Sequence, residues 1–568
     1  MPVAVVSFAQ LKACDPESFR TSAKAYRDLA DALDERADEI APQLTDFDDA
    51  WDGQGSPAAD KAIRDQAVVI TDTVLMLQRA DQILSDFAGE LDKAKAMLTD
   101  AMEAATRISA TVAENGSVTP KSAKDQTAAE EIVEQFRAAI QYADTADTTA
   151  STDLAALTPP VPGQQAPVDL STVPAIGTDP ERVKEWWNSL TPEEQQYLIA
   201  QHPDRIGWLD GVPATARDQA NRLVLDRELD TVNERMSTLE DQGQTDTDEY
   251  RELQGKKRGL EAIEDRLELS GGDGRDEDGL QSNEQRAYLL GVSTEGDGQA
   301  IVAIGNPDTA DNIVTFVPGT SAELAGVRGD IGRVDRMVYD ANNLDPTQRT
   351  AGIMWLGYDA PDQILEWNGM DDLTNLGRYG DASDPGYAQR AGTALDRFSD
   401  GLRVTHEGER SHNSIVGHSY GSTVIGYTAK DHGLDVDEAI FVGSPGVGTD
   451  TAAELGLNPE NVYSSHASND PIRYLTETEV AFGNNPSDED FGGRRFASDP
   501  GTPLFETHTG QKTYDPMGPF GPSITLPTID FEWKGGAHSD YWTDDNQSRD
   551  NIARIVTGTG GDITGDHP

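Results

Sequence analysis

From residue 285 onward, short apolar runs alternate with helical stretches, and this alternation constrains the fold more than any other feature of the chain. Four apolar runs end at a glycine or a Pro-Gly pair, and a shorter run follows: 313–317, 352–356, 414–416, 439–442 and 462–463. Helices are expected between them, at 323–340, 386–404 and 420–431. Strands alternating with helices predict a mostly parallel sheet covered by helices on both faces. Such sheets bind ligands at the carboxyl ends of their strands.

The first part of the chain has a different periodicity. Apolar residues recur every seven positions over 17–49 and again over 57–112. Two heptad helices joined by a short break predict an antiparallel helical hairpin. Gly53 and Gly55 in the break permit a turn, Ser56 can cap the second helix, and Pro57 suits its first position.

These patterns divide the chain into five parts. Residues 1–115 are expected to form the helical hairpin, and 561–568 a tail. The parts between them are a helix with a Pro-rich linker over 116–178, a helical region with an acidic loop over 179–284, and a domain of alternating strands and helices over 285–560. The predicted fold class is therefore α/β, a mostly parallel sheet with helices on both faces, preceded by an all-α helical-hairpin module.

The break in the hairpin reads Trp51-Asp52-Gly53, and with its two flanking helices it resembles the WXG100 family of small hairpins associated with type VII secretion. The resemblance implies a WXG100-like partner that docks on the hairpin. A plain coiled-coil scaffold is the alternative. The Tyr-x-x-x-Asp/Glu signal of such substrates is absent after the hairpin, because Ala146 stands four residues after Tyr142.

Gly417-His418-Ser419-Tyr420-Gly421 matches the G-x-S-x-G nucleophile elbow. It follows an apolar run and precedes a predicted helix, as the turn requires. Gly417 and Gly421 allow the sharp bend, Ser419 is the predicted nucleophile, and His418 is expected to pack rather than react. The Tyr420 N–H at the start of the helix is expected to stabilise an oxyanion.

A serine hydroxyl needs a base, and in this fold the order is Ser, acid, His. Of nine histidines, His508 and His538 remain as candidates, and His538 is favoured because it lies in a glycine-flanked loop before the last predicted helix. Asp470, before Pro471 at the end of a late strand, is the expected acid that orients His538. A structural surface aspartate is the alternative at that position.

A second oxyanion donor is expected from the loop after the strand at 313–317. The candidates are the N–H groups of Gly319 and Thr320. Thr320 could instead cap the helix that follows. Residues 476–535, between the acid and the histidine, are expected to form either a lid over the site or a surface insertion.

Beyond the elbow, the half of the chain from about 180 to 558 is similar to the actinobacterial α/β-hydrolase family known as domain of unknown function 1023. Eight segments carry the resemblance: Trp186–Leu190, Gly207–Pro213, Ala220–Arg222, Val317–Thr320, Trp355–Pro361, Gly417–Ser422, Asp470–Ile472 and His538–Tyr541. The resemblance implies a serine hydrolase that uses Ser419, Asp470 and His538. It implies little about the substrate.

Composition excludes several other classes of function. The chain has 45 basic and 101 acidic residues, a formal net charge of −56, which disfavours nucleic acid or an anionic membrane as a partner. One cysteine, Cys14, excludes an intrachain disulfide and a cysteine-based zinc site. No dinucleotide or HExxH motif is present, so no cofactor and no metal are expected. No apolar segment of membrane-spanning length and no ordinary signal peptide are visible, so a cytoplasmic location and export by a type VII-like route both stay open.

The sequence thus predicts a serine hydrolase that cleaves a carboxylic ester through an acyl-enzyme. The predicted site loops at 317–320, 417–421 and 535–539 hold no acidic residue, which points to a neutral small-molecule ester inside an acidic surface. Two alternatives stay open. One is a secretion-associated interaction protein or effector with minor activity, and the other is a peptidase or amidase acting on cell-wall peptides.

Overall fold

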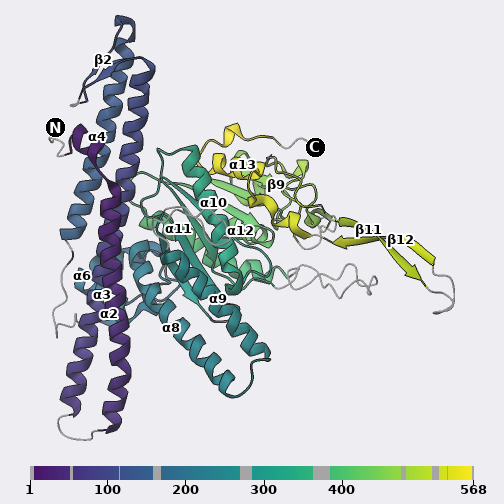
Figure 1. The fold of residues 1–568 in the computed structure, drawn as a ribbon. Coiled ribbons are helices and arrows are strands. Elements are labelled where there is room, and N and C mark those ends of the chain that lie inside the picture. The colour runs from purple at the N-terminus through teal and green to yellow at the C-terminus, as the bar shows by residue number, and fades with distance from the viewer. Residues whose placement is uncertain are drawn as a thin grey trace.

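The computed structural model describes most of the chain. The described residues are 6–50, 56–113, 116–155, 157, 168–268, 285–361, 384–474, 482–503, 505–514, 524–533 and 535–565. Long N-terminal helices stand beside a sheet with its covering helices (Figure 1). The described residues include no helix that is both long and apolar enough to cross a membrane.

The N-terminal helices form what we call the helical module, composed of α1 (Phe8–Ala13), α2 (Pro16–Ala50), α3 (Ser56–Arg107) and α4 (Gln126–Ala155). Ion pairs Arg20–Asp92 and Arg27–Asp81 join α2 to α3. The two helices are antiparallel, because the residue number of the partner in α3 falls as the residue number in α2 rises. The predicted hairpin is therefore present. Residues 51–55, which carry the Trp-Asp-Gly motif, lie outside the described residues, so the WXG100 resemblance stays a prediction.

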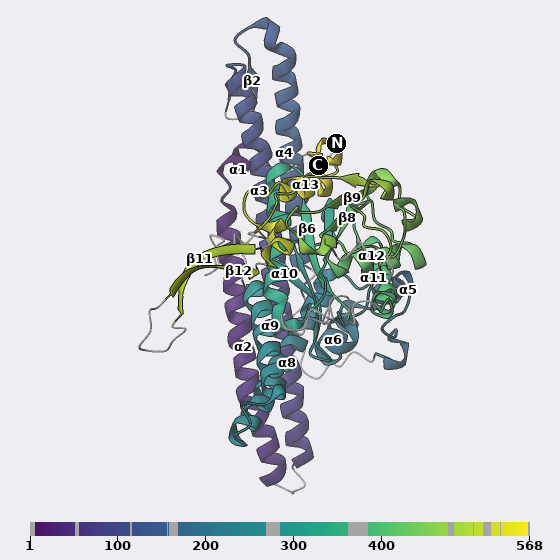
Figure 2. The same cartoon turned by 90° about the vertical axis from the view of Figure 1, so that its right-hand side faces the viewer.

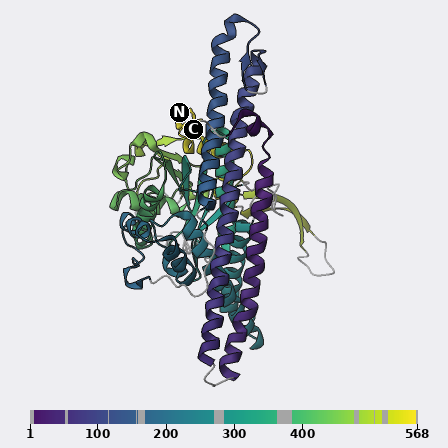
Figure 3. The ribbon, with the colours of Figure 1, turned by 90° about the vertical axis from the view of Figure 1, so that its left-hand side faces the viewer.

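α4 adds a third long helix to the hairpin. Short strands β1 (Thr111–Val112) and β2 (Val118–Thr119) pair between α3 and α4. The rings of Phe8 in α1 and Phe136 in α4 meet edge to face at 5.0 Å, within an apolar cluster shared by α1, α3 and α4. In Figure 3 the long helices of the module lie in front of the sheet.

An eight-stranded sheet forms the centre of the second half. Its order is β10-β9-β8-β7-β5-β6-β4-β3, and β4 alone runs antiparallel to its neighbours. The strands are β3 (Ala287–Ser293), β4 (Gln299–Ile304), β5 (Asn312–Val317), β6 (Thr350–Leu356), β7 (His412–His418), β8 (Glu438–Val442), β9 (Val462–Ser465) and β10 (Arg494–Arg495). Strands β5 to β9 correspond to the five predicted apolar runs. The prediction of a mostly parallel sheet is confirmed.

Helices cover both faces of this sheet (Figure 2). α10 packs with α13 on one face, and α11 packs with α12 on the other. Their bounds are α10 (Val327–Leu344), α11 (Gly386–Thr405), α12 (Tyr420–Asp431) and α13 (Gln547–Val556). The first three correspond to the helices predicted at 323–340, 386–404 and 420–431. The sheet strands contribute fully buried residues to one continuous apolar core between these layers.

Between the helical module and the sheet, the described residues form the α-helices α5 (Pro180–Ser189), α6 (Pro192–Gln201), α7 (Pro203–Ile206), α8 (Ala214–Asp241) and α9 (Asp248–Glu268). Buried polar residues of α8 cover the free edge of β3. Arg217 and Asn221 donate to the carbonyls of Leu290 and Leu289, and the Leu289 N–H donates to Asp218. An edge strand with unpaired backbone groups would invite pairing with another chain, and these side chains prevent it.

The helical module docks at the amino end of the sheet. Arg286, directly before β3, pairs with Asp81 of α3 at 3.0 Å and with Asp218 of α8 at 3.4 Å. Arg349, directly before β6, pairs with Glu90 of α3 at 3.4 Å. A cavity of about 1410 Å³ lies between the module and this end of the sheet, and the predicted catalytic residues do not line it.

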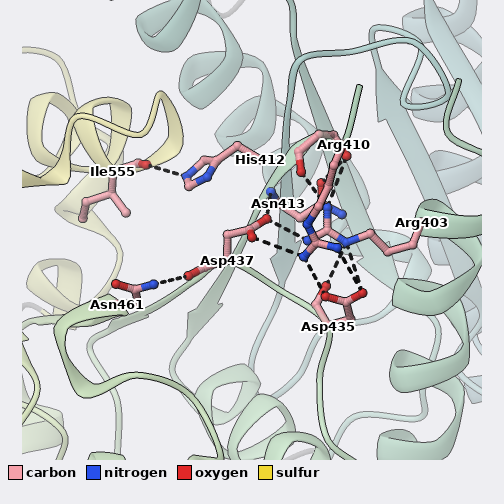
Figure 4. Close-up of polar contacts among 9 residues, drawn as sticks. Arg403, Arg410, His412, Asn413, Asp435, Asp437, Asn461 and Ile555 are labelled. Atoms are coloured by element: carbon pink, nitrogen blue, oxygen red, sulfur yellow. Dashed lines mark hydrogen bonds and ion pairs between the residues drawn. The ribbon is translucent and has the colours of Figure 1, made fainter. Parts of the chain in front are cut away.

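The amino ends of β7 and β8 carry a second set of polar contacts (Figure 4). Arg403 and Arg410 pair with Asp437 and Asp435 at 2.7 and 2.8 Å, and the Asn413 N–H donates to Asp437. These contacts fix the starts of neighbouring strands. The opposite, carboxyl ends of the same strands hold the candidate site.

The segment between the predicted acid and histidine has two parts. Residues 482–503 pack into the main core through Phe482, Phe491 and Phe496, which are at most 5% exposed. The second part is a hairpin of β11 (Phe505–Tyr514) and β12 (Ile524–Trp533), which projects away from the body (Figure 1). Residues 482–503 therefore belong to the packed body of the domain, whereas the hairpin of β11 and β12 protrudes from it and does not cover the sheet.

Candidate active site

The predicted elbow is a turn between β7 and α12. Ser419 lies between them with φ 53° and ψ −128°, a backbone conformation that residues other than glycine rarely adopt. Its N–H donates to the Val442 carbonyl at the end of the neighbouring strand β8, over 3.1 Å. Strain of this kind costs about 1–3 kcal/mol and persists only where the surroundings enforce it, which is common at functional sites.

Glycines let the elbow approach the end of β5. A Cβ on Gly421 would lie 2.1 Å from the Val317 carbonyl, and a Cβ on Gly319 would lie 2.6 Å from Ser419 Cβ. Gly417 faces the first turn of α12 in the same way, because its Cβ would lie 2.7 Å from Ser422 Cα. The loop after β5 therefore lies directly against Ser419.

Asp470 and His538 come together from positions 68 residues apart. His538 Nδ1 lies 3.0 and 2.9 Å from the two carboxylate oxygens of Asp470. Asp470 follows β9 and has no exposed surface, whereas the side chain of His538 keeps 23% exposure. A buried carboxylate beside an accessible imidazole can hold the ring with Nδ1–H towards the acid and Nε2 free to take a proton.

The hydrogen bonds around Asp470 keep it ionised. Burial by itself raises the pKa of a carboxyl group, but here the contacts to His538, the Ile472 N–H and the Tyr541 hydroxyl lower the pKa of Asp470 to about 2. The Ile472 N–H and the Tyr541 hydroxyl donate over 2.9 and 2.7 Å. The acid is therefore a fixed negative charge at neutral pH.

His418, which precedes the serine, also faces the histidine. Its ring lies 4.8 Å from the His538 ring, and its Nε2 lies 2.6 Å from the His538 carbonyl oxygen. Trp542 packs edge-on against it at 5.1 Å. Burial, helped by the neighbouring His538 and Arg333, holds the pKa of His418 well below its usual range, so the imidazole is neutral.

The residues predicted to stabilise an oxyanion lie close to one another. Tyr420 is the first residue of α12, so its N–H has no carbonyl four residues earlier in the helix to bind. Gly319 faces it, because a Cβ on Gly319 would lie 3.1 Å from Tyr420 N. The loop itself is held by the Tyr358 hydroxyl, which donates to the Pro318 carbonyl over 2.7 Å. Thr320 follows in this loop, and its buried hydroxyl has no hydrogen-bond partner among the described residues.

The structure thus brings together most of the residues singled out from the sequence. The end of β7 carries His418, Ser419 and Tyr420, and the end of β5 carries Gly319 and Thr320. His538, which is paired with Asp470, contacts His418. His508, the other histidine candidate, is in β11 of the protruding hairpin.

Two residues near the site were not predicted. Tyr541 binds the acid, and Gly443 lies against both Asp470 and His538. Tyr541 stands three residues after His538 in one of the segments that carry the family resemblance, which is a signal that could have identified it. Among the described residues no cluster of three or more His, Cys, Asp or Glu side chains could hold a metal ion.

Comparison with known proteins gives the same fold. Residues 294–480 match a family model described as "Alpha/beta hydrolase". The matched range contains the elbow and Asp470 and ends before His538. The narrower resemblance to domain of unknown function 1023 stays a prediction.

The relatives are mycobacterial. An "Uncharacterized protein Rv2079" of Mycobacterium tuberculosis is 32% identical over 365 residues, which cover 58% of this chain and 52% of the relative. An "Uncharacterized protein Mb0988c" of Mycobacterium bovis is 29% identical over 197 residues, covering 33% of this chain and 68% of the relative. The chain therefore spans about half the length of the first of these relatives. The matching family model and the eight-stranded sheet together show that this chain contains an α/β-hydrolase domain.

Proposed function

We propose that the protein is a serine hydrolase that cleaves a carboxylic ester. One observation carries the proposal: His538 is hydrogen-bonded to the buried Asp470 and lies against His418, the residue directly before a serine in a strained elbow. The match to the α/β-hydrolase family model supports a hydrolase. The ester substrate and the roles of the individual residues are our inference.

In the proposed reaction the Ser419 oxygen attacks the ester carbonyl carbon, and its proton passes to His538 Nε2. The negative charge that develops on the carbonyl oxygen is stabilised by the N–H groups of Tyr420 and of Gly319 or Thr320. The intermediate then expels the alcohol, which takes the proton from His538, and leaves an acyl group on Ser419. Water, deprotonated by His538, hydrolyses this acyl-enzyme by the same steps.

Asp470 has an orienting role in this scheme. Its carboxylate accepts the Nδ1–H of His538 and favours the imidazolium that forms in each half-reaction. The low pKa of Asp470 supports this role, because the acid then stays charged while His538 gains and loses its proton.

A covalent probe tests the proposal directly. A fluorophosphonate should label Ser419, and p-nitrophenyl butyrate should be hydrolysed. Both signals should vanish in Ser419→Ala and persist in Ser399→Ala, which removes a buried helical serine of α11 outside the site. Folded protein that neither takes the label nor hydrolyses the ester would refute the proposal.

The charge of the protein supports a neutral substrate. With a net charge of −56, the surface repels an anionic ester before it reaches the site. A neutral ester should therefore have the higher kcat/KM of a matched neutral and carboxylated pair, and the difference should shrink as salt is added.

Ester and amide hydrolysis use the same residues, so a peptidase or amidase acting on cell-wall peptides is the alternative substrate class. A butyryl p-nitroanilide compared with the butyryl p-nitrophenyl ester separates the two. The role as a partner-binding secretion protein stays a separate prediction, tested by co-purification of a small helical partner that is lost in Trp51→Ala.

A further inference from the structure

Strand β7 carries a histidine at each end, and each one reaches the C-terminal segment. His418 Nε2 lies 2.6 Å from the carbonyl oxygen of His538, and His412 Nε2 lies 3.3 Å from the carbonyl oxygen of Ile555. Figure 4 shows the second contact, with the His412 ring directed at Ile555. The first contact lies at the candidate site and the second at the opposite end of the same strand.

The chemistry of the first contact fixes the state of His418. A backbone carbonyl only accepts hydrogen bonds, so His418 Nε2 must carry the hydrogen and donate it. His418 is 5% exposed and neutral, with the ring edge-on to Trp542. It is thus a neutral Nε2–H tautomer, and its side chain serves as a fixed donor rather than a proton carrier.

The placement of this donor joins two backbones. His418 precedes Ser419 in the chain, and its acceptor is the carbonyl of His538 itself. The link therefore runs from the residue before the proposed nucleophile to the main chain of the proposed base. Any movement of one relative to the other must stretch this hydrogen bond.

The link ends on the His538 loop. This loop is a short 3-10 turn, Gly535–His538, and it follows the hairpin of β11 and β12. That hairpin projects away from the body (Figure 1), and the loop itself packs against Gly501 and Thr502. Tyr541 and Asp470 hold the loop towards β9, and His418 holds it towards β7.

We propose that His418 is a positioning residue that holds His538 in register with Ser419 through its hydrogen bond to the His538 carbonyl. The inference rests on the proposed function for its kinetic consequence. It goes beyond that function because it assigns a role to a residue that takes no part in bond making.

Three variants test the role. His418→Leu removes the donor at similar volume, His418→Gln keeps an N–H donor at the same position along the side chain, and His412→Leu removes the matched contact at the far end of β7. For p-nitrophenyl butyrate, kcat of His418→Leu should fall roughly 10- to 100-fold with KM within about twofold, because a displacement near 1 Å can cost about 100-fold in rate. His418→Gln should recover most of this loss, and His412→Leu should keep kcat within about twofold.

A second readout is independent of turnover. The Nδ1–H proton of His538, held against Asp470, should give a strongly downfield proton NMR signal in the wild-type protein. The signal should broaden or vanish in His418→Leu and persist in the other two variants. If the wild type hydrolyses no ester and takes no probe, the proposed function fails, and this signal still decides the positioning role.

Several results would overturn the inference. These are an unchanged kcat and an unchanged downfield signal in His418→Leu, equal losses in the Gln and Leu variants, or a loss in His412→Leu as large as that in His418→Leu. If His418→Leu does not fold, the comparison of His418→Gln with His412→Leu decides, since the inference requires the downfield signal to persist in His418→Gln.

Discussion

Tyr541 donates a hydrogen bond to Asp470 over 2.7 Å, from a position 71 residues further along the chain. The same hydroxyl accepts the Ala467 N–H over 2.9 Å. Both groups are buried, since Tyr541 is 1% exposed and Asp470 is 0% exposed. One phenol therefore joins the loop after β9 to the His538 loop, and it supplies one of the donors that keep the acid ionised.

Tyr541→Phe should weaken both the fold and the site. A hydrogen bond to a buried charged group contributes roughly 1.5–3 kcal/mol, so urea unfolding should show a loss of this size. The pKa of Asp470 should rise, and kcat for a p-nitrophenyl ester should fall. Tyr427→Phe on α12, which removes a phenol hydroxyl away from Asp470, should change neither. Equal effects of the two substitutions would contradict the assignment.

Asp470→Asn should affect catalysis and the pH dependence of stability separately. The neutral amide no longer favours the Nδ1–H tautomer of His538, so kcat should fall by roughly 10³–10⁴. The pKa of Asp470 in the folded protein, about 2, lies below the ordinary value of 3.8. Its carboxylate therefore stabilises the fold above pH 4 by about 2 kcal/mol, and this contribution disappears as the pH falls through 2.

Unfolding curves of the wild type and Asp470→Asn between pH 7 and pH 2.5 measure this contribution. The gap between them should be widest at pH 7 and should narrow below pH 4. Asp241→Asn, at the exposed end of α8, is the control and should show no such gap. A gap that widens on acidification would contradict the low pKa.

Gly443 follows β8 and lies between the strands that carry Ser419 and Asp470. It has φ +56°, and a Cβ there would lie 2.9 Å from Asp470 Oδ2 and 3.3 Å from His538 Cε1. Gly443→Ala should therefore lose stability through backbone strain, about 1–2 kcal/mol, and also displace the acid and lose activity.

Gly433→Ala separates the two effects. Gly433 has φ +80° with no atom within 4 Å of the position of its Cβ. This variant should lose a similar stability, measured by thermal unfolding, and keep its kcat. If both variants lost activity alike, strain rather than contact with Asp470 would be the cause.

The sequence predicts those parts of this molecule that depend on local patterns. Apolar runs that end at a glycine or a Pro-Gly pair identified β5 to β8, a shorter apolar run identified β9, and the elbow motif located the turn at Ser419. The edge pair β3 and β4 was not singled out, and Gly291, where the register of β3 shifts, interrupts its pattern. That glycine is explained only by tertiary packing, because a Cβ there would lie 2.9 Å from the Trp208 ring.

Contacts between residues distant in the chain were predictable only where a sequence motif marked both partners. The order of motifs made Asp470 and His538 candidates for a pair, and the structure brings them into contact. The family resemblance marks Tyr541 as a residue of interest, but its hydrogen bond to Asp470 and the hydrogen bond of His418 were not predictable, because each depends on where the His538 loop lies against β9 and β7. The docking of the helical module was not predictable either, since no sequence motif distinguishes Asp81 from the rest of the 101 acidic residues.

That docking gives the last prediction. Arg286 has only 8% side-chain exposure and pairs with Asp81 of α3 and Asp218 of α8. Arg286→Met would leave both carboxylates buried with one cation fewer, so the protein should lose roughly 3 kcal/mol of stability. Arg410→Met removes an arginine that is 56% exposed and also pairs with two aspartates, and it should cost about 0–1 kcal/mol. Urea unfolding measures both, and faster tryptic release of the helical module in Arg286→Met alone would locate the loss at the interface; equal costs would contradict a buried electrostatic link.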